Sequence, residues 1–135
     1  MRHKVSEPAL TRLGVELGGA LPMGSVVWLT GELGAGKTTL VAALVEGLGG
    51  AGGVSSPTYD LVHRYETIAG PVFHVDCYRL RSPDEAAELD WENLIAGRAL
   101  LVEWPERAGP WAPPPDRTVS LEHTDEEGSR WIDLQ

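Results

Sequence analysis

The sequence predicts an α/β fold of three layers, with helices on both faces of a mostly parallel central sheet and antiparallel hairpins added to that sheet. Two observations lead to this prediction. Apolar, β-branched runs of strand length alternate with helical stripes along the 135 residues. One such run, residues 25–30, leads directly into Gly31-Glu32-Leu33-Gly34-Ala35-Gly36-Lys37-Thr38, which matches the P-loop pattern G-x-x-x-x-G-K-[ST]. The predicted fold class is therefore that of the P-loop NTPases.

Length and composition indicate a single P-loop domain over residues 1–135. The chain is 42% hydrophobic and contains no apolar run of membrane-spanning length, so we expect a soluble, cytoplasmic protein without membrane contact. Cys77 is the single cysteine and has no partner for an internal disulfide. We expect it as a small buried side chain in a strand.

The formal net charge is −9. An acidic surface repels the phosphate backbone of nucleic acids, so strong binding of a polynucleotide by this chain alone is not expected. A nucleotide is a different case, because loop dipoles, one lysine and Mg²⁺ can hold it locally.

The first predicted elements surround the loop. Residues 6–20 form a helix, since Ser6 can cap it and leucines recur at helical spacing. Residues 25–30 form the strand that delivers the loop. Residues 37–48 form the next helix, which ends in a cluster of glycines.

Next, residues 61–65 and 72–79 flank a turn and predict an antiparallel hairpin at a margin of the sheet. Ser82 and Pro83 are typical of a helix start, and one helix is expected from there to residue 94 or 95.

The last part of the chain begins with residues 98–103, a short apolar run that predicts a strand ending before Pro105. A proline-rich connector over residues 110–115 follows. Residues 118–123 and 129–134 alternate on either side of a polar turn, which predicts a closing hairpin.

The loop carries the clearest chemistry. Glycines let several backbone N–H groups point into one concavity, where they can hold a polyphosphate together with the start of the following helix. Lys37 would reach the β- and γ-phosphates of ATP, and the Thr38 hydroxyl would bind Mg²⁺. The predicted nucleotide-binding residues here are Gly31, Glu32, Leu33, Gly34, Ala35, Gly36, Lys37, Thr38 and Thr39.

Hydrolysis also needs a carboxylate near Mg²⁺ or the attacking water. Asp76 and Glu103 each end an apolar run, where a buried strand would deliver them to the edge that carries the loop. The alternative is that each is a strand-end carboxylate in a surface hydrogen bond. Thr58, after Pro57, is the third candidate and could sense the γ-phosphate or position water.

We therefore predict Asp76, Glu103 and Thr58 as catalytic residues and Thr38, Glu103 and Asp76 as Mg²⁺ ligands. His63, His74 and His123 show no metal-ligand spacing, and strand alternation accounts for them. Three functions remain open on these residues: an ATPase that acts through partners, a kinase for a small metabolite or nucleoside, and a nucleotide-dependent adaptor that does not hydrolyse. The chain shows no long arginine-rich lid segment, which counts against the kinase.

Four motifs in order carry a resemblance to a known family. They are residues 31–39, Ser-Pro-Thr-Tyr at 56–59, His-Val-Asp-Cys-Tyr-Arg-Leu at 74–80 and Val-Glu-Trp-Pro-Glu-Arg at 102–107. Together they resemble the TsaE family, also called YjeE, of bacterial P-loop ATPases required for threonylcarbamoyladenosine modification of tRNA. The resemblance covers roughly residues 6–107 and, less distinctly, the C-terminal hairpin.

The resemblance implies a slow, partner-dependent ATPase that uses ATP and Mg²⁺ and acts with TsaB and TsaD proteins. It would support the modifying complex without modifying tRNA itself, so its contact with tRNA would be indirect. By motif, Asp76 and Glu103 would be the acids of the site, with Trp104 beside them. Thr11 and Arg130 would lie near the adenine. Cys77 and Asp90-Trp91 depart from the family pattern, and the second departure concerns local helix geometry.

Overall fold

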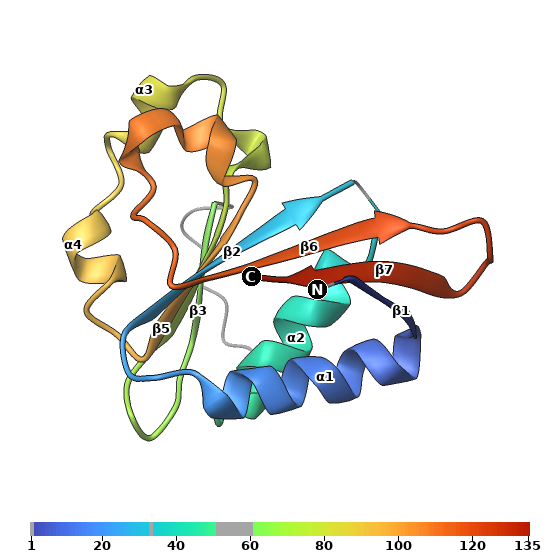
Figure 1. Cartoon of the computed structure of the whole chain (residues 1–135). Coiled ribbons are helices and arrows are strands. Elements are labelled where there is room, and N and C mark those ends of the chain that lie inside the picture. The colour runs from blue at the N-terminus through green and yellow to red at the C-terminus, as the bar shows by residue number, and fades with distance from the viewer. Residues whose placement is uncertain (1, 33, 51–60) are drawn as a thin grey trace.

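A seven-stranded sheet forms the centre of the chain (Figure 1). The computed structural model describes residues 2–32, 34–50 and 61–135, and the sheet lies within those residues. The spatial order of the strands is β1-β7-β6-β2-β5-β4-β3. Their bounds are β1 Arg2–Ser6, β2 Ser25–Gly31, β3 Val62–Tyr65, β4 Val72–Asp76, β5 Ala99–Glu103, β6 Arg117–His123 and β7 Ser129–Leu134.

The sheet is parallel at its centre and antiparallel at its margins. Strands β6, β2, β5 and β4 run parallel, whereas β3 pairs antiparallel with β4, and β7 with β6 and β1. The predicted fold class and both predicted hairpins are confirmed. Because the carboxyl ends of the parallel strands meet at one edge, residues that follow β2, β4 and β5 are brought together there.

Helices cover both faces of the sheet and complete the three predicted layers (Figure 1). Helices α1 (Glu7–Ala20) and α2 (Lys37–Gly47) lie on one face. The other face carries the short helices α3 (Pro83–Ala86) and α4 (Trp91–Leu94) and the 3₁₀ segments η1 (Cys77–Arg79) and η2 (Pro105–Trp111). Within the described residues, no helix has both the length and the apolar character that crossing a bilayer requires.

Side chains of the strands alternate between two cores. Val27 and Leu29 of β2 belong to the core under α1 and α2, whereas Val26 belongs to the core under α3 and α4. Phe73 and Val75 of β4 likewise face α3 and α4. The intervening residues of these strands are therefore free to face α2 and the loop.

Helices α1 and α2 pack closely because glycines line their contact. A Cβ atom added at Gly18 of α1 would lie 2.4 Å from the carbonyl oxygen of Leu44. One added at Gly47 of α2 would lie 2.1 Å from the carbonyl oxygen of Val15. Neither position has room for a side chain, so the backbone of one helix rests directly on the other. This packing fixes the axis of the helix that follows the P-loop.

The single helix expected from Ser82 and Pro83 to residue 94 or 95 is wrong. Two short helices, α3 and α4, take its place. The Asp90 carboxylate accepts a hydrogen bond from the backbone N–H of Asn93 and so begins a new helix at Trp91. The Trp91 indole N–H donates to the carbonyl oxygen of Ala86 at 2.8 Å, which ties the two helices together. The Asp90-Trp91 pair is thus the cause of the break.

Two further details differ from expectation. Cys77 is fully buried, as predicted, but it lies in η1 and not in a strand, because the Asp76 side chain caps that turn. Strand β1 is not indicated by the sequence, since its residues carry no apolar alternation. It is held by backbone pairing with β7 and by the ion pair of Lys4 with Glu126.

Candidate functional site

The loop between β2 and α2 curls through glycine backbone angles. Gly31, Gly34 and Gly36 have φ of 134°, 75° and 102°, values that other residues avoid. A Cβ atom at Gly31 would lie 2.0 Å from the carbonyl oxygen of Leu121 on β6, so no side chain fits there. Gly36 is the N-cap of α2, which leaves the free N–H groups of the first turn beside the loop. This is a backbone suited to an anion.

Lys37 places its ammonium group inside the loop. The residue is only 7% exposed, and Nζ donates to the carbonyl oxygens of Gly31 at 2.7 Å and Glu32 at 2.8 Å. Burial lowers the pKa of Lys37, while Glu103, Asp76, Glu106 and Glu32 oppose that shift. Nearby carboxylates therefore favour the charged amine at the point where phosphate is expected.

Asp76 and Glu103 are brought together beside the loop. They end the parallel strands β4 and β5 and are direct partners in the register of that pair. Both line a cavity of about 330 Å³ with Lys37 and Thr38. The remaining lining residues are Gly34, Gly36, Tyr78 and Trp104. The two predicted acids, the predicted lysine and the predicted Mg²⁺ hydroxyl thus share one cavity.

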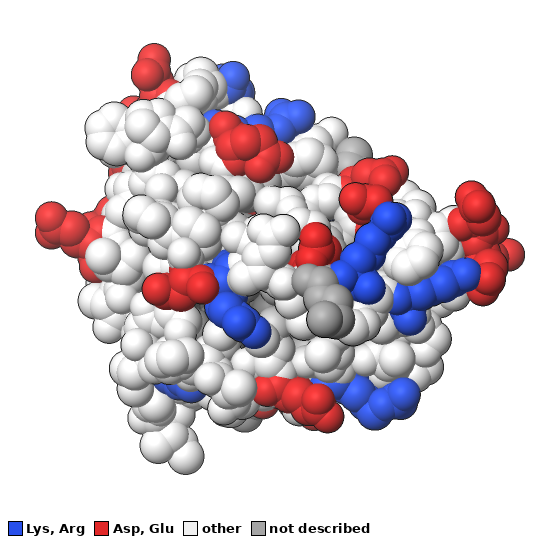
Figure 2. Space-filling view, viewed as in Figure 1, with Lys and Arg blue, Asp and Glu red and all other residues white. Residues whose placement is uncertain are grey.

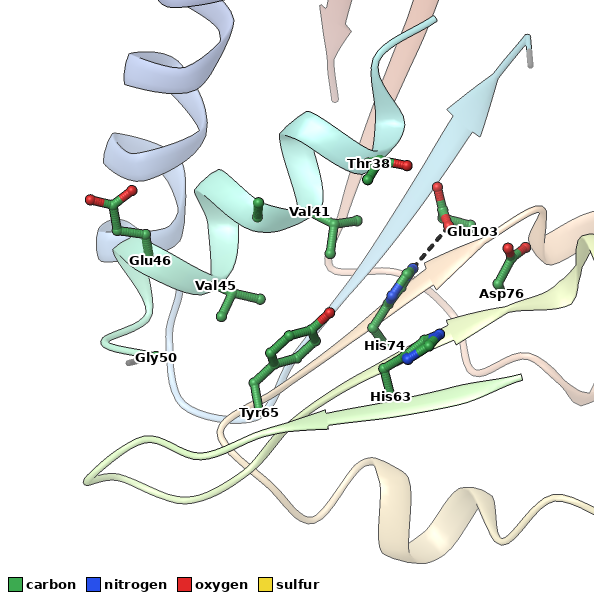
Figure 3. A pocket seen from close by; sticks show the side chains of 11 residues that line it. Thr38, Val41, Val45, Glu46, Gly50, His63, Tyr65, His74, Asp76 and Glu103 are labelled. Carbon is green, nitrogen blue, oxygen red and sulfur yellow. Dashed lines mark hydrogen bonds and ion pairs between the residues drawn. The ribbon is translucent and has the colours of Figure 1, made fainter. Parts of the chain in front are cut away.

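A second cavity, of about 570 Å³, continues from this site between α2 and the hairpin of β3 and β4 (Figure 3). It shares Thr38, Asp76 and Glu103 with the first cavity. His63, Tyr65 and His74 form its opposite wall, with Val41, Ala42, Val45, Glu46 and Gly50 on the side of α2. Burial, and then the charge of Glu103, raise the pKa of Tyr65.

His74 is a site residue that spacing alone does not reveal. Its Nε2 lies 2.9 Å from Oε2 of Glu103, and both side chains are buried. The available signal is its position two residues before Asp76, which puts both on the same face of β4. Strand alternation explains why His74 faces inward but says nothing of this bond.

Trp104 is held in the site by an unusual backbone. Its φ of 55° is the one positive value at a non-glycine residue in the described chain. The ring centroid lies 4.6 Å from the Lys37 amine and 5.1 Å from the Tyr78 ring centroid. Arg107 of η2 stacks over Tyr78 at 4.5 Å. The Trp104 ring thus covers the Lys37 amine, and Tyr78 and Arg107 pack against that ring.

The two predicted adenine neighbours are placed differently. Arg130 of β7 lines a cavity of about 180 Å³ on the other side of the loop, and its Nε donates to the carbonyl oxygen of Ala35 at 3.1 Å. Thr39 also lines that cavity, together with Glu7, Leu10, Gly34, Gly36 and Gly128. Thr11 is not among the described lining residues. Leu33 and Thr58 lie outside the described residues, so their predicted roles stay predictions.

The donor set fits a hard cation. The Thr38 hydroxyl and the carboxylates of Asp76 and Glu103 offer oxygen ligands, which Mg²⁺ prefers. Among residues 2–32, 34–50 and 61–135, no three His, Cys, Asp or Glu side chains converge as a metal cage. Mg²⁺ commonly binds through one or two carboxylates plus phosphate and water, so such a cage is not required.

Comparison with known proteins places these features in a family. The family model described as "Threonylcarbamoyl adenosine biosynthesis protein TsaE" matches residues 5–132. The chain is 41% identical over 127 residues to the "tRNA threonylcarbamoyladenosine biosynthesis protein TsaE" of Nostoc sp., covering 90% of this chain and 76% of that protein.

Two other relatives bear the same name. The protein of Streptomyces coelicolor is 42% identical over 72% of this chain and 68% of its own length. That of Haemophilus influenzae is 36% identical over 75% of this chain and 65% of its own length. The chain thus spans between 65% and 76% of the length of these three relatives.

A solved structure shares the fold. The crystal structure of Bacillus subtilis YdiB aligns with 99% of this chain and 83% of its own, with a TM-score of 0.77. The two sequences are 23% identical in that alignment, so this likeness concerns the fold alone.

Proposed function

The chain belongs to the TsaE family of threonylcarbamoyl adenosine biosynthesis, and from this membership we propose that it binds ATP with Mg²⁺ and hydrolyses it slowly in support of that pathway. The observation that carries the proposal is the register pair of Asp76 and Glu103 in one cavity with Lys37 and Thr38. A phosphate-binding loop alone would support binding only. Two carboxylates beside it supply what hydrolysis needs in addition.

In this proposal the loop holds the phosphates. Backbone N–H groups between Gly31 and Thr39 bind their oxygens, and the Lys37 amine exchanges its carbonyl partners for the β- and γ-phosphates. The Trp104 ring and the burial of Lys37 keep water away from that amine. Arg130, on the far side of the loop, contacts the nucleoside part.

The remaining groups serve the metal and the water. Thr38, Asp76 and Glu103 would hold Mg²⁺, which would neutralise negative charge on the phosphates. Between them, the two carboxylates ligate the cation and orient the attacking water. Thr58, whose motif implies a role in sensing the γ-phosphate or positioning water, is proposed to act with them.

We further propose that turnover depends on partners. Proteins of the TsaB and TsaD type would contact this chain and hold the tRNA, and the acidic surface of the chain suits contact with basic protein surfaces. The modification itself would take place on those partners, and hydrolysis here would change their assembly or conformation.

The test is phosphate release from ATP by the chain alone and with TsaB and TsaD proteins, with and without EDTA. Lys37→Ala should weaken nucleotide binding about tenfold or more, because one charge-assisted hydrogen bond is worth about 1.5–3 kcal/mol. Glu103→Gln should retain binding and lower turnover about a hundredfold. Lys4, the only other lysine, lies on β1, and Lys4→Ala should behave like the wild type.

Other outcomes identify the other functions. Phosphate that appears on an added nucleoside or sugar would favour a kinase. Tight nucleotide binding without turnover under any partner would favour an adaptor. Unchanged ATP binding in Lys37→Ala would remove the basis of the proposal.

A further inference from the structure

We propose that His74 is a positioning residue for Glu103: by holding one oxygen of that carboxylate, it presents the other to the cation and water beside Thr38. The inference rests on the proposed function, because it assigns a task to Glu103 within the ATP site. It adds a residue that neither the loop pattern nor the two strand-end acids require.

The first step is the burial of the pair. His74 is 9% exposed and Glu103 is 7% exposed, and Nε2 of His74 lies 2.9 Å from Oε2 of Glu103. A buried carboxylate is costly unless a hydrogen-bond donor satisfies it. We assign the donor role to Nε2 of His74, because a carboxylate oxygen accepts. Within the described chain, this is the hydrogen bond that holds the Glu103 side chain.

The second step is the orientation of the histidine ring. His63 of β3 stacks on His74 with 5.5 Å between ring centroids and 24° between ring planes. The two residues are direct partners in the antiparallel register of β3 and β4. The stacked ring limits rotation of His74, so the direction of its Nε2 donor is set by the sheet. The hairpin of β3 and β4 thereby helps to orient a side chain of the site.

The third step is the oxygen that remains. Figure 3 shows the bond drawn to one oxygen of Glu103, while the other lies on the side of Thr38. Thr38, Asp76 and Glu103 line the same cavity, which agrees with that view. Fixing Oε2 leaves Oε1 as the oxygen directed to the site. Residues that hydrogen-bond to the ligands of a metal ion orient those ligands. Their loss commonly lowers metal affinity or activity 10- to 100-fold.

The experiment compares three substitutions in the full chain. Gln places an amide nitrogen as many bonds from Cα as Nε2 of histidine and can still donate, so His74→Gln keeps the contact. His74→Asn has the same amide one bond shorter and loses the reach. His74→Phe keeps ring volume but has no donor. Thermal unfolding of each variant reports folding, and His74→Asn serves if His74→Phe does not fold.

Two readouts are measured. The first, without turnover, is the ratio of ATP affinities in Mg²⁺ and in EDTA, from titration calorimetry. The second is the separate kcat and KM for phosphate release with partner proteins. In His74→Asn and His74→Phe, we expect the ratio of ATP affinity in Mg²⁺ to ATP affinity in EDTA, or kcat, to fall about tenfold or more. ATP affinity in EDTA should not change. His74→Gln should recover most of that loss.

The comparison between amides decides the matter. If His74→Gln and His74→Asn behave alike, whether both like the wild type or both impaired, the hydrogen bond does not position Glu103 and the inference is overturned. A wild-type chain that binds no ATP would overturn the proposed function and this inference with it. A wild type that binds ATP with Mg²⁺, beside variants that do not differ, would overturn the inference alone.

Discussion

At the scale of single residues, the carboxylates of the site also act on the one thiol. Cys77 follows Asp76 directly and is fully buried in η1. Burial, and then the charges of Asp76, Glu106 and Glu103, raise the pKa of the Cys77 thiol to about 12. The thiol therefore stays protonated in the folded protein up to strongly alkaline pH, and only the thiolate is a nucleophile.

This predicts an inert cysteine in the folded state. At pH 8, iodoacetamide should label Cys77 very slowly in native protein and readily after unfolding in guanidinium chloride. Ile68 is fully exposed at the turn between β3 and β4, so Ile68→Cys supplies a matched exposed thiol. Peptide mass spectrometry over time measures both rates. Similar rates for Cys77 and the introduced thiol in native protein would contradict the prediction.

At the scale of elements, the contact of α1 with α2 decides where the P-loop helix lies. Gly47 and Gly19 are both glycines near helix ends, but their surroundings differ. A Cβ atom at Gly47 would meet the Val15 carbonyl oxygen at 2.1 Å, whereas one at Gly19 would have its nearest neighbour at an ordinary 3.6 Å. Substitution by alanine at Gly19 therefore changes helix propensity alone, whereas the same substitution at Gly47 also disturbs the packing of α1 on α2.

Gly47→Ala should lower the free energy of unfolding by about 1–3 kcal/mol, because the backbones of α1 and α2 must separate. Gly19→Ala should be neutral or raise it by about 0.4–1 kcal/mol, since alanine reduces the entropy of the unfolded chain. Urea unfolding followed by circular dichroism measures both. A stabilising effect of Gly47→Ala would show that the helices move apart without cost.

Some elements of the fold could be predicted from the sequence, and others could not. The strand before the P-loop, the helix after it and both hairpins follow from local periodicity and turn residues, and the cavity with Asp76 and Glu103 follows from parallel strands that end together. Three features depend on contacts made across the fold. The break at Asp90 needs the bond from Trp91 to Ala86, β1 needs β7, and the bond from His74 to Glu103 joins two strands.

At the scale of the whole molecule, the distribution of charge bears on binding to nucleic acid. The net charge is −9, and on the face shown in Figure 2 acidic side chains lie between the basic ones. Nucleic-acid binding draws most of its affinity from many Lys and Arg contacts with phosphates. A surface on which Asp and Glu side chains lie between the Lys and Arg side chains lacks that source of affinity.

We therefore expect this chain alone to bind tRNA no more tightly than about 10⁻⁴ M at physiological salt, the weak end of ordinary non-specific binding. Filter binding with labelled tRNA measures this, and TsaB and TsaD proteins serve as the comparison. Micromolar binding by the chain alone that weakens steeply with added salt would contradict the expectation.

The outer strand β1 bears on the order in which the molecule assembles. Lys4 pairs with Trp131, which lies 127 residues further along the chain, whereas His63 pairs with His74, which lies 11 residues further. By loop-closure entropy, the first contact costs about 2 kcal/mol more than the second. This difference favours early formation of the hairpin of β3 and β4. Pairing of β1 with β7 becomes favourable only after the central strands have brought the two ends of the chain close together.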